Sequence, residues 1–364
     1  MIYLIDTIGT ETGMHLYDNA FRRAFEKEGV EVTILSNYKD TGTIPIIKNF
    51  YHGNIIRKIF LLMVSYFNML IFYHKNKKNN IFIYQSFGLR IFDEYFIKLF
   101  NNYPNLYVIV HDIFDIKNDH DEDLKKAHKI EIYKKYIPNI ISHSQRTITD
   151  LRAIGYQNKI LFFPHFSYDF SKELDLNKVG PDIQQSLSSE KINFLFFGQI
   201  RMSKGIDILI DALSFIDERI RKQINVIIAG QDKTNIITST NVPDFVNKIC
   251  RYINDSELNY LFKNVDYILL PYKEIYQSGV LEAVIYFQKP AIMSNIGYFS
   301  DIKKAYPSFG ITYEPNTGKD LAKIIQDTVV NHNVNTFYNE FDLKKYIDDH
   351  NPKQLINEIL KNRN

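Results

Sequence analysis

The chain has 364 residues, of which 45% are hydrophobic and 24% are charged, the balance of a globular rather than a disordered protein. This length exceeds what one hydrophobic core usually serves, so we expect two domains. The formal net charge of +2 argues against a nucleic-acid-binding protein, which needs a concentrated basic face. The single cysteine, Cys250, excludes an intramolecular disulfide framework and suits a reducing compartment.

The N-terminal residues 1–7 lack the basic start and the cleavage site of a signal peptide, and we interpret them as a first buried strand. The longest apolar stretch, residues 59–73, is interrupted by Ser65 and Asn68. It falls short of the roughly 20 residues that span a bilayer. We therefore expect a cytoplasmic protein, either soluble or peripheral on the inner face of a membrane.

Short apolar runs alternate with helix-length segments along the whole chain. The runs lack polar alternation, which is typical of strands buried on both faces of a parallel sheet. Among the expected helices are residues 16–28, which Gly29 ends, and residues 205–216, where apolar residues recur at helical spacing. The expected strands are residues 2–5, 30–35, 81–84, 106–110, 140–142, 160–163, 192–197, 225–229, 267–270 and 291–294.

This order repeats a βαβ pattern in both halves, so it predicts two Rossmann-like doubly wound α/β domains. The polar stretch 167–191 contains Gly180-Pro181 and precedes a new strand, and we place the boundary within it. We expect an N-terminal domain over residues 1–170 and a C-terminal domain over residues 171–342. A C-terminal helix over residues 343–364 is expected to pack back toward the N-terminal domain.

Two candidate sites follow strands of the first half, where a doubly wound sheet binds its ligands. Gly9 and Gly13 flank a turn before a helix, which allows a ligand to approach the backbone and favours an anion. The alternative is a plain connecting turn. His111 directly follows the strand 106–110 and could hydrogen-bond sugar hydroxyls. The alternative is a structural histidine whose ring is satisfied by Asp112 or by a loop carbonyl.

A third candidate site opens the second half of the chain. Gly198 follows a buried strand, and Arg201 and Lys204 come before Gly205 and a helix. Two cations beside a helix start can stabilise the negative charge that develops on a departing phosphate. The alternative is a pair of solvated surface cations.

The fourth candidate site follows the strand 267–270. Glu274 lies in a polar loop, and Ser278-Gly279-Val280 stands where a helix begins, so backbone N–H groups there would point at a diphosphate. Glu282, one turn into that helix, would reach ribose hydroxyls as an acceptor, and Glu274 would reach the hexose. The alternative is a loop glutamate plus a first-turn glutamate that the helix dipole favours.

At these residues the sequence resembles the GT-B-fold retaining glycosyltransferases, of glycosyltransferase family 4 (group 1) type. Glu274 and Glu282 match the family's pair of glutamates separated by seven residues. The resemblance assigns the first to the donor sugar and the second to the ribose. It also implies that the two domains face an interdomain cleft, with the acceptor bound by the N-terminal domain and the nucleotide sugar by the C-terminal domain.

Other segments extend the resemblance over nearly the whole chain. Residues 198–205 resemble the family's phosphate motif, with Arg201 and Lys204 as diphosphate binders, although Gln199 stands where many members have arginine. Residues 251–253 resemble the stretch whose backbone holds the nucleotide base. His111 matches the histidine that contacts the donor sugar, and Gly13 matches the glycine loop. The expected donor-site residues are Gly13, Gly198, Arg201, Lys204, Gly230, Tyr252, Ile253, Glu274, Ser278, Gly279, Val280 and Glu282, and the expected catalytic residues are Glu274, His111, Arg201 and Lys204.

The resemblance implies a retaining hexosyltransferase that uses a nucleotide-diphosphate sugar, with UDP as the expected nucleotide, in bacterial surface polysaccharide or glycoconjugate synthesis. The acceptor would be a glycan or a lipid-linked molecule. No metal or other cofactor is expected, because residues 119–123 are interpreted as a solvated charged loop rather than a metal site. The resemblance further implies a front-face mechanism, in which the leaving phosphate helps to deprotonate the acceptor.

Two other functions remain open from the residues. A sugar-nucleotide epimerase or hydrolase on the same fold would need an added acid–base group beyond His111. A non-catalytic transferase-like protein would bind a sugar or a partner only. The presence of Glu274, Glu282, Arg201 and Lys204 argues against that last function, and fold alone decides none of them.

Residues 57–78 combine aromatic and aliphatic side chains with flanking lysines and arginine. One interpretation is a basic, aromatic helix lying on an anionic membrane surface. The alternative is an ordinary buried helix, which the spread of apolar residues over most faces favours. We therefore expect a core helix whose basic end, residues 75–78, lies near a membrane that carries a lipid-linked acceptor.

Overall fold

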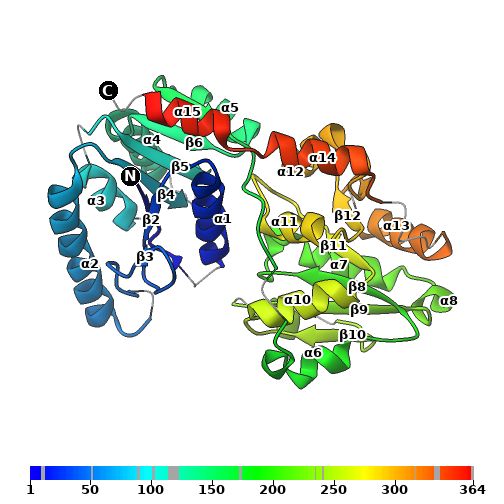
Figure 1. Cartoon of the computed structure of the whole chain (residues 1–364). Helices are drawn as coiled ribbons and strands as arrows, with labels where there is room; N and C mark the ends of the chain where they lie inside the picture. The colour runs from blue at the N-terminus through cyan, green and yellow to red at the C-terminus, as the bar shows by residue number, and fades with distance from the viewer. Residues whose placement is uncertain are drawn as a thin grey trace. The chain divides into compact units, whose positions relative to one another are not determined.

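The chain folds into two compact units, Met1–Tyr168 with Asp349–Asn364, and Asp169–Asp348. The structure is a computed structural model that describes residues 1–9, 13–50, 52–87, 91–100, 103–113, 123–171, 174–233, 235–239, 242–315, 317–331 and 337–361. Each unit is an α/β layer structure built on one parallel sheet (Figure 1).

Unit 1 carries a seven-stranded sheet in the order β3-β2-β1-β4-β5-β6-β7, with every described pair parallel. Its strands are β1 (Ile2–Ile5), β2 (Val32–Leu35), β3 (Thr43–Ile44), β4 (Ile81–Phe87), β5 (Leu106–Asp112), β6 (Asn139–Ser142) and β7 (Lys159–Phe162). Its helices are α1 (Met14–Lys27), α2 (Ile55–Asn76), α3 (Ile91–Leu99), α4 (Asp123–Tyr136), α5 (Gln145–Ala153) and α15 (Lys353–Lys361).

Successive side chains of β1 point to opposite faces of this sheet, as the pleat of a strand requires. Ile2 and Leu4 join an apolar core with residues of α1 and α15. Tyr3 and Ile5 join a second core with residues of α2, α3 and α4. Helices therefore cover both faces, which explains why the strands of the first half are apolar without alternation.

Unit 2 repeats the architecture with six parallel strands in the order β10-β9-β8-β11-β12-β13. Its strands are β8 (Ile192–Phe197), β9 (Ile224–Ala229), β10 (Val246–Ile249), β11 (Tyr267–Leu270), β12 (Ala291–Ser294) and β13 (Ile311–Tyr313). Its helical segments are η2 (Leu176–Lys178), α6 (Pro181–Ser186), η3 (Met202–Lys204), α7 (Ile206–Ser214), α8 (Glu218–Arg221), α9 (Ile236–Ser239), α10 (Asp255–Asn264), α11 (Gly279–Tyr286), α12 (Gly297–Ala305), α13 (Gly318–Val330) and α14 (Glu340–Asp349).

The C-terminal segment differs from the single helix expected over residues 343–364. It forms two helices, α14 and α15, and the division between the units falls between Asp348 and Asp349. Pro352 explains the break, because proline lacks an N–H group and disfavours a helical conformation in the residue before it. Asn351 then caps α15 by accepting a hydrogen bond from the Lys353 N–H at 2.9 Å.

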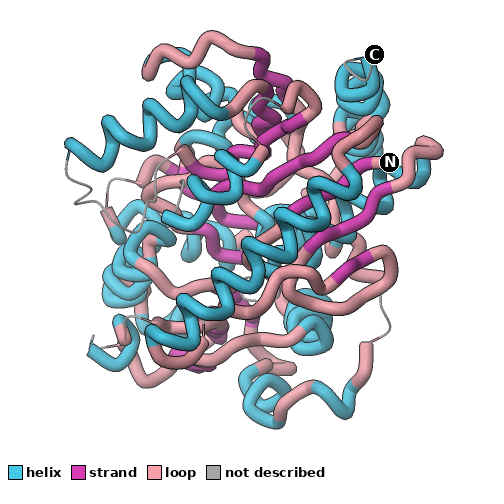
Figure 2. Tube along the Cα trace, turned by 90° about the vertical axis from the view of Figure 1, so that its left-hand side faces the viewer, coloured by secondary structure: helices cyan, strands magenta, loops and turns pink. Residues whose placement is uncertain are grey.

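The helix α2 corrects the expectation of a core helix. One face of this 22-residue helix lies against unit 1, and the opposite face is exposed although it is apolar. Figure 2, which views unit 1 from the α2 side, shows this long helix running across the front of the strands. Among the described residues, α2 is the one helix whose length and composition would suit a membrane crossing.

Candidate functional site

The carboxyl ends of β8 and β9 in unit 2 meet in a tight backbone junction. Gly198 follows β8 with a φ of 110°, and Gly230 follows β9 with a φ of 152°. A Cβ atom on Gly230 would lie 1.7 Å from the Gly198 carbonyl oxygen, so only glycine fits there. A Cβ atom on Gly198 would lie 3.4 Å from the Val280 Cγ2 atom. The fold thus places these three predicted residues side by side.

A second junction joins the loop after β8 to the loop after β11. Gly205 has a φ of 68°, and a Cβ atom on it would lie 1.7 Å from the Pro271 carbonyl oxygen. The Ser203 carbonyl oxygen accepts hydrogen bonds from the N–H of Lys273 at 3.0 Å and from the N–H of Glu274 at 3.4 Å. The expected phosphate loop and the loop of Glu274 are therefore one connected structure.

The charges of the two expected cations both act on Tyr272 in this structure. The Lys204 Nζ atom lies 3.8 Å from the centre of the Tyr272 ring, a cation–π arrangement. Burial raises the pKa of the Tyr272 hydroxyl, and the positive charge of nearby Arg201 lowers it in part. Lys273, by contrast, forms an ion pair with Asp207. Arg201 and Lys204 are each partly exposed, so their charges can reach a bound anion.

The helix α11 begins beside this junction. Ser278 is its N-cap, and the Ser278 hydroxyl accepts a hydrogen bond from the Leu281 N–H at 3.2 Å. The first N–H groups of a helix have no acceptor within the helix, so those of Gly279 and Val280 can donate to an anion. Val280 already contacts the Gly198 junction, which places this helix start next to the phosphate loop.

The two glutamates of the predicted pair have opposite environments. Glu274 is exposed in the loop before α11, whereas the side chain of Glu282 is buried inside that helix. The Tyr346 hydroxyl lies 2.7 Å from both carboxyl oxygens of Glu282. Burial raises the pKa of Glu282 to about 8. The carboxyl group is thus mostly neutral at pH 7, and its role toward a ribose stays a prediction.

The stretch expected to hold a nucleotide base is fixed by Arg251. Its guanidinium group donates to both oxygens of Asp182, at 2.8 and 3.0 Å, and to both oxygens of Glu257, at 2.6 and 2.8 Å. It also donates to the Tyr252 carbonyl oxygen at 2.9 Å. The Tyr252 side chain is 49% exposed, and Ile253 is buried. The backbone here is therefore held rigidly while an aromatic ring stays accessible.

In unit 1, His111 is the second-last residue of β5, so it stands at the carboxyl end of that strand as the sequence predicts. Its Nε2 atom lies 3.1 Å from the Gln85 Oε1 atom. The Gln85 amide donates to Asp18 Oδ1 at 2.6 Å, so its oxygen faces the histidine and the His111 Nε2 atom carries the proton. The ring stacks on Phe87 with centroids 4.4 Å apart. The Asp112 side chain, named as an alternative partner, lies outside the described residues.

A pair of buried carboxyl groups lies behind this histidine. Asp6 and Asp18 are both buried, and their carboxyl groups share a hydrogen bond. Burial, together with the charge of Asp6, raises the pKa of Asp18 well above its usual range. Asp6 accepts hydrogen bonds from the N–H groups of Ile8 and Gly9. Hydrogen bonds therefore connect the loop after β1, through Asp6, Asp18 and Gln85, to the His111 ring.

Gly13 is the N-cap of α1 in this loop, with a φ of 77° and open space around the position of a Cβ atom. Residues 10–12 of the loop lie outside the described residues, as does most of the charged loop 119–123. Within the described residues no group of three or more His, Cys, Asp or Glu side chains could hold a metal ion.

Four residues in these environments escaped the sequence analysis. Tyr272 directly follows the Leu-Leu-Pro end of β11, so its place in the chain could have pointed to it. Gln85, Asp18 and Tyr346 gave no such signal, because their partners are 26, 67 and 64 residues away in the sequence. The structure places His111 and Gly13 in unit 1 and the other predicted site residues in unit 2.

Comparisons with known proteins show a family match in the second half of the chain and fold similarity over the whole chain. Residues 181–340 match the model of the family described as glycosyl transferases group 1. No curated protein sequence matches the chain. The sucrose-phosphate synthase of Thermosynechococcus elongatus is similar in structure, with a TM-score of 0.72 and 14% identity over 99% of this chain and 97% of that chain.

Two further solved structures are similar over almost their full lengths. Anabaena HepE in complex with UDP-glucose has a TM-score of 0.70 and 14% identity, covering 99% of this chain and 98% of that chain. WaaG, a glycosyltransferase involved in lipopolysaccharide biosynthesis, has a TM-score of 0.63 and 14% identity, covering 97% of this chain and 95% of that chain. Residues 181–340 therefore match glycosyl transferases group 1, and the chain as a whole shares the fold of these solved glycosyltransferase structures.

Proposed function

We propose that this enzyme transfers a hexose from a UDP-linked sugar, with retention of anomeric configuration, to a glycan or lipid-linked acceptor. The observation that carries the proposal is the joined loop structure after β8 and β11. There Lys204 lies over the Tyr272 ring, the positive charge of Arg201 acts on the Tyr272 hydroxyl, and the Ser203 carbonyl accepts hydrogen bonds from the loop of Glu274. A diphosphate at this place would meet two cations and the start of α11.

The chemistry proposed follows from this charge distribution. Breaking the bond between the sugar C1 and the phosphate oxygen leaves negative charge on the diphosphate. Arg201, Lys204 and the N–H groups of Gly279 and Val280 stabilise that charge without a metal ion. The acceptor oxygen forms its bond to C1 on the same face, and its proton passes to the departing phosphate.

The remaining site residues are proposed to bind and orient the donor. Glu274 and His111 would contact the hexose, and Glu282 would contact the ribose. The exposed ring of Tyr252 and the backbone that Arg251 fixes would hold the base. Gly13, Gly198, Gly230, Ile253 and Ser278 complete the proposed donor site.

The similar structures support the donor and the biological setting proposed. HepE is described with UDP-glucose bound, and WaaG acts in lipopolysaccharide biosynthesis. By that likeness we propose a role in bacterial surface polysaccharide or glycoconjugate synthesis, at the cytoplasmic side of a membrane. Unit 1 would bind the acceptor, and unit 2 would bind the nucleotide sugar.

The substitution Lys204→Ala tests the proposal. We expect a loss of transfer on the order of 100-fold or more in kcat, because one charge-stabilising group at the leaving phosphate is removed. Lys222→Ala is the matched control, since Lys222 is a 75% exposed cation paired with Glu218 on the same unit. UDP release from UDP-hexoses with and without EDTA gives the rate, and NMR of the product gives the anomeric configuration.

Several results would contradict parts of this proposal. Full activity of the Lys204→Ala variant, with circular dichroism showing an intact fold, would exclude the phosphate role. Loss of wild-type activity in EDTA would exclude the metal-free mechanism. Release of free hexose with no product in the presence of acceptors would favour a hydrolase on the same fold.

A further inference from the structure

The helix α2 has one face that is attached to unit 1. The Ser65 hydroxyl accepts a hydrogen bond from the Lys48 N–H at 2.8 Å, and the Asn68 amide donates to the Ile46 carbonyl at 3.1 Å. Met69 and Tyr73 are buried in the unit 1 core. Because these contacts are spread along the helix, α2 is held against the unit over most of its length.

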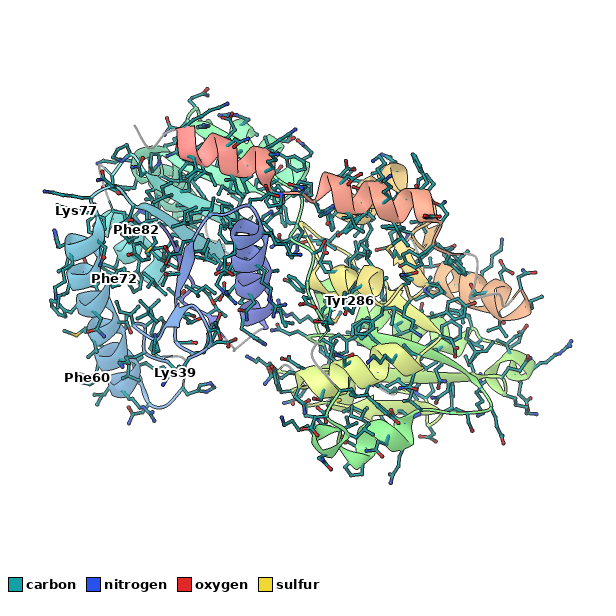
Figure 3. The ribbon with its side chains drawn as sticks, viewed as in Figure 1. Lys39, Phe60, Phe72, Lys77, Phe82 and Tyr286 are labelled. Carbon is teal, nitrogen blue, oxygen red and sulfur yellow. The ribbon has the colours of Figure 1, made fainter. Side chains whose placement is uncertain are left out.

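The opposite face of α2 is an apolar stripe that the described residues leave exposed. Its residues recur at steps of three and four, the spacing of one side of a helix. Phe60 is 63% exposed, and Phe67 is 55% exposed. Figure 3 labels Phe60 on this helix and, on its inner side, Phe72 and Phe82. The stripe consists of Ile55, Ile56, Ile59, Phe60, Met63, Phe67 and Ile71, each more than half exposed.

Along the chain, the charged residues of α2 and of the segments that flank it are all positive. Between Asp40 and Asp93 the sequence contains no Asp or Glu, and it contains seven Lys or Arg residues. Five of them bracket the stripe: Arg57 and Lys58 stand in the first turn of α2, and Lys75, Lys77 and Lys78 follow its last exposed apolar residue. A surface that is apolar along its centre and cationic at both ends complements an interface of acyl chains and anionic headgroups.

We propose that the stripe of α2 docks this enzyme on an anionic membrane surface, with the helix axis in the plane of the membrane. The apolar residues enter the boundary between headgroups and acyl chains, and the flanking lysines and arginine bind the anionic headgroups. The docking itself needs only the chemistry of α2. Its purpose, access to a lipid-linked acceptor, rests on the proposed function.

Two other arrangements fit the observations less well. A helix that crosses the bilayer would have to abandon the contacts of Ser65, Asn68 and Met69, which bury its inner face in unit 1. A second copy of the chain seated on the stripe would bring two cationic surfaces together. Like charges at both ends of the contact would then oppose the apolar attraction.

Vesicle flotation of the full chain tests the proposal. We expect binding to vesicles of phosphatidylcholine with phosphatidylglycerol, weaker binding to phosphatidylcholine alone, and a further decrease at high salt. The double substitution Phe60→Glu with Phe67→Glu should reduce binding at least tenfold. The matched control is Phe341→Glu, which changes a phenylalanine of unit 2 that is 74% exposed. Replacing Lys75, Lys77 and Lys78 by Gln should weaken binding to anionic vesicles on the order of 100-fold.

The outcomes separate this proposal from the function proposed above. Equal binding of the wild type and the Phe60→Glu, Phe67→Glu variant would overturn the docking surface. Resistance of bound wild type to carbonate extraction would overturn the in-plane arrangement. A dimer in solution that the double substitution dissociates, without vesicle binding, would show a second copy as the occupant. UDP-glucose should raise the melting temperature of the wild type and of all α2 variants by the same amount. If UDP-glucose did not stabilise the wild type, that result would contradict the proposed donor site and not the docking surface.

Discussion

The carboxyl group of Glu282 shows how a single residue can be tuned by its surroundings. Burial raises its pKa to about 8, against 4.5 in an unfolded chain. The native state therefore holds a proton that the unfolded state has already released between these two pH values. The stability that the neutral carboxyl contributes is complete below about pH 4.5 and is lost as the pH rises through 8.

We predict that Glu282→Gln removes this pH dependence. The amide cannot ionise, so the free energy of unfolding of unit 2 should stay constant between pH 6 and 9 in this variant. In the wild type it should fall by at most several kcal/mol over the same range, as the size of the Glu282 pKa shift implies. Thermal unfolding across this range measures the difference, which should amount to several degrees at pH 9. Glu274→Gln is the matched control, because Glu274 is exposed.

The same two variants should have similar effects on activity and different effects on the pH dependence of stability. Both glutamates belong to the proposed donor site, so both substitutions should weaken use of the donor. Only Glu282→Gln should change the pH profile of stability. Parallel melting curves for the wild type and Glu282→Gln from pH 6 to 9 would show that the carboxyl group is not buried in its neutral form.

At this scale the sequence located residues better than it located their partners. The position of His111 at the end of a strand followed from the apolar run before it. Its bond to Gln85 depends on the pairing of β4 with β5, in which Gln85 lies beside Ile109. A pattern read along the chain contains no information on side chains brought together across strands, and Asp18 and Tyr346 were missed for the same reason.

The sheet edges distinguish the elements that the sequence predicted from those it did not. All ten expected strands are present, whereas β3, β10 and β13 were missed, and each of these lies at an edge of its sheet. An edge strand is covered less completely and is often short, so it has no continuous apolar run. Val246–Ile249 has two polar residues in its centre, of which Asn247 is partly exposed and Lys248 is exposed, and β3 has two residues only.

The connection between two loops gives a prediction at the level of elements. Gly205→Ala would place a Cβ atom 1.7 Å from the Pro271 carbonyl oxygen, which cannot move without shifting the end of β11. We expect the variant to lose donor binding and to destabilise unit 2 by about 2 kcal/mol or more, through strain and the shifted backbone. Isothermal titration with UDP and chemical denaturation measure the two effects.

Gly29→Ala provides the matched control for Gly205→Ala. Gly29 has a similar φ of 77°, but nothing lies within 4 Å of the position of its Cβ atom. It should therefore cost only the strain of a left-handed backbone, about 1 kcal/mol, and leave UDP binding unchanged. Equal losses in the two variants would mean that the contact with Pro271 has no special importance.

The whole molecule is organised so that the end of the chain completes the first unit. The α15 helix buries Leu355, Ile356 and Ile359 in the same core as β1 and α1. Lys159 and Glu358 add an ion pair at 3.3 Å. Unit 1 therefore includes residues separated by nearly the full length of the sequence, and it cannot complete this core until the last helix is present.

We predict that Ile359→Ala destabilises unit 1 by about 3 kcal/mol, because the side chain is fully buried and its removal leaves a cavity. Ile347→Ala, at a residue that is 66% exposed, should change stability by less than about 0.5 kcal/mol. Calorimetry of the two variants measures this, and UDP binding should persist in both. Equal melting temperatures would contradict the role assigned to α15.

The sequence by itself determined the fold class, the order of the buried strands and the loops that carry the proposed donor site. These properties are local, because apolar runs, glycines and charged residues next to strand ends are visible along the chain. Only the tertiary structure decided the pairing of Glu282 with Tyr346, the link from His111 to Asp18, and the exposure of α2. The exposure of α2 could not be predicted because its apolar residues lie on most of its faces. Such a pattern indicates that the helix needs an apolar environment, but only the tertiary structure decides which face the rest of the protein covers.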